Sequence, residues 1–229
     1  KLDFNVNFLA ILFRYLRFQY KYIEKLIKYN KYQGKTDHSI INHNPFISEN
    51  TVKHIQKLKD SISYSATYNS NTIHIIVYNN DAKYANKLIK QLITIFFVIV
   101  ELRGYKNIQI NTSIWLTYLK KKINYNQDFI GKDEVNSAVS SFKHKIHNNK
   151  LDYNNDNIGE IFIWRKEEVK KVFIHELLHS LNFDFFHYPN ELKHDLLTKF
   201  PLDMELDLFR IGESYVETWA CVLNCLLVC

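Results

Sequence analysis

The chain has 229 residues, and 46% of them are hydrophobic, so it can bury a sizeable core and is not intrinsically disordered. The net charge is +6. The longest basic run covers only residues 120–122, however, and scattered lysines do not indicate a nucleic-acid-binding module. Five Gly and three Pro in the whole chain favour long helices, because few residues interrupt them.

The N-terminal residues 3–31 predict one long amphipathic helix rich in Phe, Tyr, Leu and Lys. Its apolar stretch, residues 8–13, is short and is followed by Arg14 and Arg17, so it predicts neither a transmembrane segment nor a signal peptide. We expect this helix to pack on the body of the protein, with an interfacial membrane helix as the alternative. Beyond a polar loop, residues 49–59 predict a short helix.

The middle of the chain predicts a hairpin followed by a buried helix. Residues 61–68 and 72–78 are two strand-like runs separated by Asn69-Ser70-Asn71, a turn-forming sequence. Asp81 is a suitable N-cap for a helix that reaches Leu102 and is ended by Gly104. Because its residues 93–100 are apolar all round, we expect this helix to be buried.

The second half predicts two further strands and two further helices. Residues 107–120 contain a strand, and residues 121–157 are mostly loop with a short strand within 136–142. Residues 158–164 are a strand that leads into a helix beginning at Lys166. Connecting structure follows over residues 183–208, with a helix near 190–199, and a last helix begins near Gly212.

The sequence HELLH occupies residues 175–179 of the helix that follows the strand. Four residues apart on a helix, His175 and His179 share one face, which is the spacing that two imidazoles need to bind one zinc ion. Glu176 can act as general base on a metal-bound water. Apart from the motif itself, residues 172–181 carry no charge, so we expect a buried helix.

A second acidic pair supports the first motif. Glu213 and Glu217 are also four residues apart on a predicted helix, surrounded by apolar Val216, Trp219 and Ala220. A catalytic zinc ion takes three protein ligands and leaves one position for water, so one carboxylate can be the third ligand. The other can accept the free N–H of a ligating histidine and fix its tautomer.

These residues resemble the zincin metallopeptidases, specifically the gluzincin branch, with HExxH on one helix and E-x-x-x-D/E on a later one. The resemblance implies His175, His179 and Glu213 as zinc ligands, Glu176 as the base and Glu217 as the support of a ligating histidine. It also implies that the HExxH helix follows an edge strand at the cleft. The metzincin branch fits poorly, because Asn182 and Phe185 stand where it has Gly and His.

Two assignments stay open. Asp184 and His187 are alternative third ligands in the loop after HELLH. The donor that would hold the oxyanion of the tetrahedral intermediate is one of four residues, Tyr215, His187, Tyr188 and Arg210.

A closer resemblance covers roughly residues 107–225. The blocks 158–176, 136–138 and 213–220 are similar to uncharacterised metallopeptidase-like proteins of giant DNA viruses of amoebae. That resemblance implies a fold and a metal site but no substrate, and it places the protein in the cytoplasm or the virion. The chain begins without Met and ends within a helical pattern at Cys229, as a truncated chain would.

The three cysteines, Cys221, Cys225 and Cys229, follow one another at helical spacing. Neighbours on one helix seldom form a disulfide, so we expect free, mostly buried thiols and a reducing compartment. Cys221 lies one turn beyond Glu217, where a regulatory thiol is a minor alternative.

Taken together, the elements predict an α+β protein in which a small mixed sheet packs on long helices. We expect an N-terminal helical region over residues 1–60 and a zincin-like catalytic domain over 61–229, or one continuous domain. The expected function is that of a zinc metallopeptidase acting on peptide or protein. Residues 159–164 would receive the substrate by strand addition or else form an ordinary interior strand. The alternatives are a non-enzymatic zinc-binding structural or interaction protein and a basic nucleic-acid-associated protein.

Overall fold

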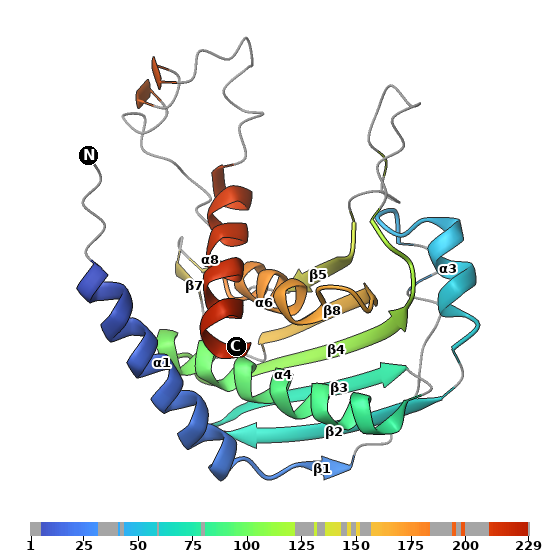
Figure 1. The fold of residues 1–229 in the computed structure, drawn as a ribbon, viewed down its shortest axis with the longest axis horizontal. Coiled ribbons are helices and arrows are strands. Elements are labelled where there is room, and N and C mark those ends of the chain that lie inside the picture. The colour runs from blue at the N-terminus through green and yellow to red at the C-terminus, as the bar shows by residue number, and fades with distance from the viewer. Residues whose placement is uncertain are drawn as a thin grey trace.

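The computed structural model describes residues 6–31, 41, 44–58, 60–78, 81–121, 131, 136–142, 146–147, 150–151, 157–183, 194–195, 198–199 and 211–228. Within these ranges the chain forms a mixed α+β fold, in which helices pack against a six-stranded sheet (Figure 1). None of the described helices combines the length and the apolar character that crossing a bilayer requires.

A hairpin begins the sheet, as predicted. Strands β2 (Ser61–Tyr68) and β3 (Asn71–Tyr78) pair antiparallel in continuous register. Asn69 and Ser70 join them with φ of 47° and 64°, which is the left-handed geometry that a two-residue hairpin turn requires. The short strand β1 (Asn30–Lys31) extends the sheet on the outer side of β2.

Helix α4 (Ala82–Arg103) crosses over the sheet to the parallel strand β4 (Ile108–Thr117). Both predicted caps are confirmed. The Asp81 side chain accepts a hydrogen bond from the Tyr84 amide, and Gly104 ends the helix with φ 65° and ψ 26°, a conformation that glycine adopts at little cost. The predicted all-apolar segment is buried as expected.

The strand order is β1-β2-β3-β4-β8-β5, and it corrects one expectation from the sequence. Strand β8 (Asn157–Arg165), which leads to HELLH, is an interior strand, parallel to β4 on one side and antiparallel to β5 (Ala138–Phe142) on the other. The expected edge position is therefore wrong, as is strand addition at residues 159–164. Because both sides of β8 are hydrogen-bonded, the edge strand at this end of the sheet is β5.

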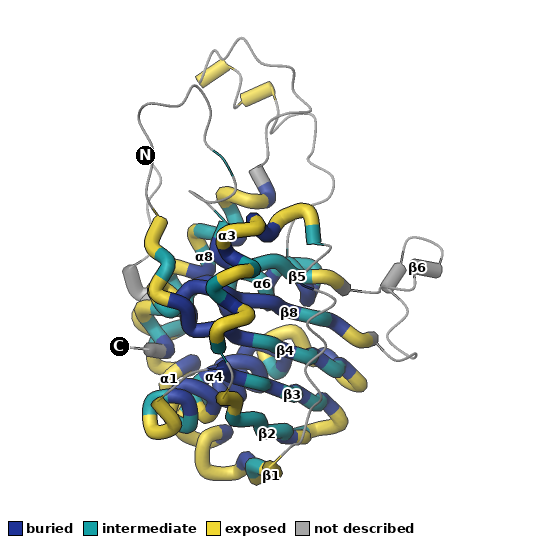
Figure 2. The backbone as a smooth tube through the Cα atoms, turned by 90° about the vertical axis from the view of Figure 1, so that its right-hand side faces the viewer, coloured by how far each residue is buried: buried dark blue, intermediate teal, exposed yellow. Residues whose placement is uncertain are grey.

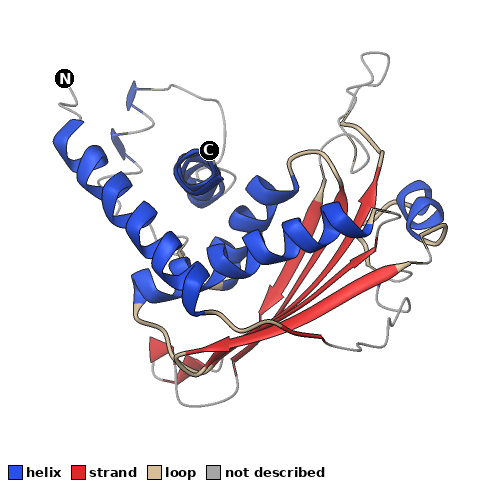
Figure 3. Cartoon of the chain, turned by 60° about the horizontal axis from the view of Figure 1, so that its bottom comes forward, coloured by secondary structure: helices blue, strands red, loops and turns tan. Residues whose placement is uncertain are grey.

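Side chains alternate between two apolar clusters on the two faces of the sheet. Ile161 and Ile163 of β8 face the larger cluster, together with Ile110 of β4. The helices α4 and α6 (Val169–Ser180) cover that face. Trp164 and Phe162 point the other way, into the smaller cluster beside α3 (Glu49–Ile55). The helices that cover the larger cluster lie together on one side of the sheet in Figure 3.

The N-terminal helix α1 (Val6–Leu26) is shorter than the predicted 3–31, because the chain leaves it to form β1. Its residues Leu16 and Ile23 are fully buried in the larger cluster. The N-terminal helix therefore shares its core with the sheet. Helix α3, capped by Ser48, matches the start of the predicted helix over 49–59 and ends at Ile55.

The two helices of the predicted site lie side by side. Helix α6 (Val169–Ser180) carries HELLH, and α8 (Ile211–Val228) carries both acidic residues (Figure 1). Helix α6 starts at Val169 rather than Lys166, because Glu168 has a left-handed φ of 60° that a helix cannot include. Most of the helix expected near 190–199 lies outside the described residues. Strands β6 (Ile146–His147) and β7 (Lys150–Leu151) form a separate small pair.

Candidate metal centre

Helix α6 buries its apolar side chains and turns the two histidines toward α8. Phe173, Ile174, Leu177 and Leu178 are at most 1% exposed, whereas His175 and His179 keep 15% and 22% of their side-chain surface. This pattern confirms the predicted buried helix. It arises because residues four apart share one helix face and the remaining positions face the core.

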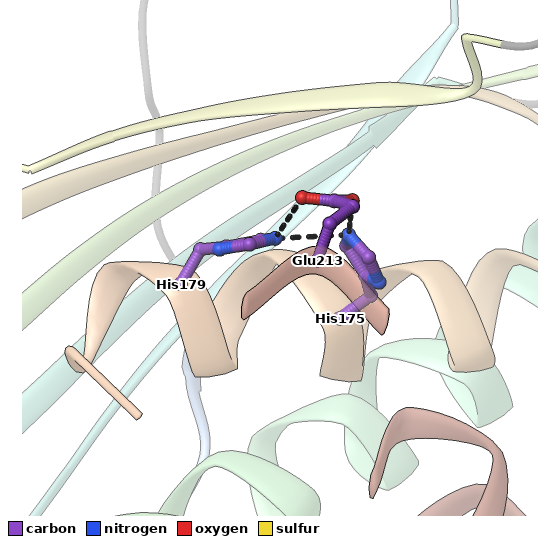
Figure 4. Close-up of side chains that lie close together, drawn as sticks. All are labelled: His175, His179 and Glu213. Carbon is purple, nitrogen blue, oxygen red and sulfur yellow. Dashed lines mark hydrogen bonds and ion pairs between the residues drawn. The ribbon is translucent and has the colours of Figure 1, made fainter. Parts of the chain in front are cut away.

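Helix α8 places Glu213 against both imidazoles (Figure 4). Its carboxylate oxygens lie 3.0 Å from His175 Nε2 and 3.2 Å from His179 Nε2, and the two Nε2 atoms are 3.1 Å apart. Buried Val216 and Ala220 seat α8 on the core, so the helix face that carries Glu213 meets α6. The two histidines and Glu213 therefore form one cluster, although 34 residues separate Glu213 from His179 along the chain.

The donor set fits a zinc ion. The candidate ligand atoms of the three residues lie within 4.8 Å of one another. Two imidazole nitrogens and one carboxylate oxygen are common zinc ligands, and bonds of about 2.0–2.1 Å place tetrahedral ligand atoms about 3.3 Å apart. The spacings of 3.0–3.2 Å are close to that value, so only a small outward movement would admit the ion. Half of the Glu213 side chain, 53%, is exposed.

Hydrogen bonds from the two histidines keep Glu213 ionised. Hydrogen bonds from the His175 and His179 side chains hold the pKa of Glu213 far below its ordinary range. An ionised carboxylate is the form that binds a metal cation. Glu213 therefore offers an ionised carboxylate, and the protons that the two Nε2 atoms share with it are those that a bound ion would displace.

Glu217 contacts the His175 ring nitrogen that does not face Glu213. Its Oε2 lies 3.0 Å from His175 Nδ1, and its Oε1 accepts a hydrogen bond of 2.7 Å from Lys171 Nζ. Burial alone would raise the pKa of Glu217, but the hydrogen bond and charge of Lys171, together with His175, lower it below the ordinary value. An ionised Glu217 favours the His175 tautomer with its proton on Nδ1, which leaves Nε2 free as a ligand.

Glu176 contacts the strand β5. Ser140 Oγ of that strand donates a hydrogen bond of 2.6 Å to Glu176 Oε2. Burial raises the pKa of Glu176, although the Ser140 hydrogen bond and the nearby histidines oppose the shift. A carboxylate with a raised pKa is a stronger base, as general-base catalysis near neutral pH requires.

A cavity of about 230 Å³ opens beside this constellation. Its walls come from the start of β5, the N-terminal half of α6, the first turns of α8 and Lys121, which follows β4. His175, Glu176 and Glu213 all line it, so two of the three candidate ligands and the candidate base face one shared space.

Sequence reasoning missed two residues of this site. Ser140 gave no signal, because a serine on a short strand within a polar region is common. Lys171 did give one, since it lies four residues before His175 and therefore on the same helix face. Its burial would lower its pKa, but the hydrogen bond and charge of Glu217 raise it, so the side chain stays cationic.

The candidate oxyanion donors are only partly described. Tyr215 lies two residues from Glu213, about 200° around the helix, and its ring packs on the larger cluster and against Trp219 at 6.3 Å. His187, Tyr188 and Arg210 lie outside the described residues, as does Asp184, so both loop alternatives for the third ligand stay predictions.

The cysteines differ from their prediction. Cys221 and Cys225 are free, as expected, but both are exposed rather than buried. They fall on the outward side of α8, because Val216, Ala220 and Leu223 occupy its core side. Cys221 Sγ lies 3.8 Å from Glu217 Oε1, and Cys229 is outside the described residues.

Comparisons with protein-family models, with curated proteins and with solved structures found no match to this chain. The functional argument therefore depends on the residues and their geometry.

Proposed function

We propose that this protein is a zinc-dependent peptidase of the zincin type, with Glu176 as its general base. One observation carries the proposal: His175, His179 and Glu213 converge beside a cavity that Glu176 also lines. Metal ligands and a carboxylate base around one open space are the parts that metal-assisted hydrolysis requires.

Each residue has a distinct role in the proposed reaction. His175, His179 and Glu213 would hold the ion, which when bound supplies a polarised carbonyl and a water of lowered pKa. Glu176 takes a proton from the attacking water and passes it to the leaving nitrogen. Ser140 orients Glu176 through its hydrogen bond, and Glu217 orients His175.

The edge strand supports a peptide as the substrate class. β5 pairs with β8 on one side, and among the described residues no strand pairs with its other side, where a partner strand could add. Ala138, the first residue of this strand, and Ser137, just before it, line the cavity. An extended peptide that adds beside β5 would pass the candidate base, and its backbone would be bound by strand addition.

A purely structural zinc site fits these residues less well. Such a site is usually closed by a fourth protein ligand, whereas three potential ligands come together in the described part of the chain. Glu213 is also half exposed, which leaves solvent access on its side. A structural ion, moreover, has no use for a carboxylate base held against the cavity.

The deciding test uses Glu176→Gln in the zinc-loaded protein. We expect the variant to bind one zinc ion per chain as the unsubstituted protein does, and to lose at least about 100-fold in peptide-bond hydrolysis, because general-base catalysis contributes on the order of 10²–10⁴-fold. Cleavage of a mixed peptide pool can be followed by mass spectrometry. Glu167→Gln, an exposed glutamate just before the same helix, is the matched control and should cleave normally. Full hydrolysis by Glu176→Gln would contradict the proposed base.

A further inference from the structure

Helix α1 exposes a row of large hydrophobic side chains. Nine large hydrophobic residues are exposed within the described ranges, and five of them lie on this one helix. Their exposed fractions run from 45% to 66%, for Ile11, Tyr15, Phe18, Tyr22 and Leu26. Exposed apolar residues are ordinary when scattered, but a contiguous row on one element marks an interaction surface.

The spacing of these residues makes the row a continuous stripe. At 100° per residue, Ile11, Tyr15, Phe18, Tyr22 and Leu26 fall within about 80° of one another around the helix. We call these five residues the outer stripe. The rings of Phe18 and Tyr22 stack within it, with centroids 6.2 Å apart.

The outer stripe does not serve the folding of the described body. A different face of α1, with Leu16 and Ile23, is fully buried and packs into the larger cluster. That face is centred more than 100° from the outer stripe on the helix. The helix thus has two separate apolar faces, and α1 lies at the outside of the helical layer, with exposed positions along its length (Figures 1 and 2).

A basic flank runs beside the outer stripe. Arg14, Lys21 and Lys25 fall on the same side of it, within about 60° of Phe18. Residues 6–31 contain six basic residues against the single acidic Glu24. Whatever covers the stripe must therefore also accommodate a dense positive charge.

This charge argues against a second copy as the partner. If two α1 helices packed antiparallel through the stripe, their basic flanks would face each other and repel. In a parallel pair, the basic flank would lie against the other edge of the stripe, where Leu12, Gln19 and Leu26 offer no acidic partner. Neither arrangement pairs the positive charges.

An anionic bilayer surface matches both features. A helix lying in the plane of a membrane inserts its apolar face about 5–10 Å into the headgroup–acyl boundary, and its lysines contact lipid phosphates. Tyr15 and Tyr22 suit that boundary, because tyrosine joins an apolar ring to a polar hydroxyl. A bilayer surface can also receive the convex surface of a helix without a preformed groove, which a protein partner would have to provide.

We propose that α1 binds the surface of anionic membranes through the outer stripe and its basic flank. The body of the protein stays on the aqueous side, because a different face of α1 is already packed against it. This proposal is independent of the proposed catalytic function.

Vesicle flotation tests the proposal. The full chain is mixed with vesicles of phosphatidylcholine containing 30% phosphatidylserine, or of phosphatidylcholine alone. We expect binding at least tenfold tighter to the anionic vesicles, and weaker binding in high salt. Phe18→Gln/Tyr22→Gln should lose at least tenfold in affinity, and Lys21→Gln/Lys25→Gln roughly fivefold per charge removed.

The control is Tyr118→Gln, which removes an aromatic ring that is 81% exposed and lies far from α1 in the sequence. It should float like the unsubstituted protein, and thermal melts should show that all variants fold. The proposal is overturned if the unsubstituted protein does not bind anionic vesicles, or if Phe18→Gln/Tyr22→Gln binds them unchanged. It is equally overturned by a soluble dimer that this double variant dissociates, which would make the stripe a protein–protein interface.

Discussion

Ser140 on the edge strand β5 donates a hydrogen bond of 2.6 Å to Glu176 on α6, 36 residues further along the chain. This hydrogen bond links two parts of the proposed site. One is the sheet edge, beside which we expect a peptide to bind as an added strand, and the other is the carboxylate that we expect to activate water. Ser140 faces α6 because it pairs with Ile161, whose side chain lies on the helix-covered face of the sheet. Substrate binding and proton transfer would thus share one structural element.

Ser140→Ala should reduce kcat by about 10- to 100-fold, because a hydrogen bond to a charged group is worth about 1.5–3 kcal/mol. Zinc content should stay unchanged, since Ser140 is not a proposed ligand. Ser141→Ala is the matched control, because Ser141 is exposed and points to the other face of β5. Steady-state kinetics on one peptide would check this, and equal loss in both variants would contradict the orienting role.

Lys171→Met should weaken zinc binding about 10- to 100-fold, the usual cost of losing a group that supports a ligating histidine. Without the ammonium group, Glu217 would lose the cation that lowers its pKa and would hold His175 less well. Lys171→Arg, which keeps the charge, should recover most of the affinity. Competition against a chelator measures each constant, and unchanged affinity in Lys171→Met would rule out this support.

Glu213→Ala should weaken zinc binding by more than roughly 100-fold, because it removes a direct ligand rather than a supporting group. His187→Ala should change the affinity little. The same competition assay compares the two variants directly. The reverse order would move the third ligand into the loop after HELLH.

Local sequence signals predicted much of this fold because they act within a few residues. The turn at Asn69 and Ser70 and the caps Asp81 and Gly104 each define their own neighbourhood. The convergence of HELLH with Glu213 also followed from helical spacing and from the ligand count of zinc. Both motifs lie on helices, where position in sequence determines position on a face.

Strand order was the main failure, because it depends on pairing between distant segments. Residues 158–164 are apolar enough for an edge or an interior strand, and only the short β5 decides between the two. The contacts of Ser140 and Lys171 with Glu176 and Glu217 span 36 and 46 residues, so no local pattern predicts these partners, although the spacing of Lys171 from His175 placed both on one helix face. The exposed cysteines show the same limit, since the side of α8 that faces the core is set by tertiary packing.

Tyr20 reports whether α1 is docked on the body. Burial, with Glu24 as the next cause, raises the pKa of Tyr20 from 10.0 to about 12. The folded state thus holds the phenol proton more tightly than the unfolded state. The contribution of Tyr20 to the free energy of unfolding is therefore complete below pH 10 and is lost as the pH rises through 12. Urea unfolding between about pH 10 and pH 12 should show a steeper loss of stability in the unsubstituted protein than in Tyr20→Phe. Equal slopes would indicate that Tyr20 is not buried.

The most direct test of the proposed metal centre is a crystal structure of the zinc-loaded protein with anomalous data at the zinc edge. We predict one strong anomalous peak bonded to His175 Nε2, His179 Nε2 and a Glu213 carboxylate oxygen, with a water or no protein atom in the fourth position. A peak closed by a fourth protein ligand, or one located away from these three residues, would contradict the account.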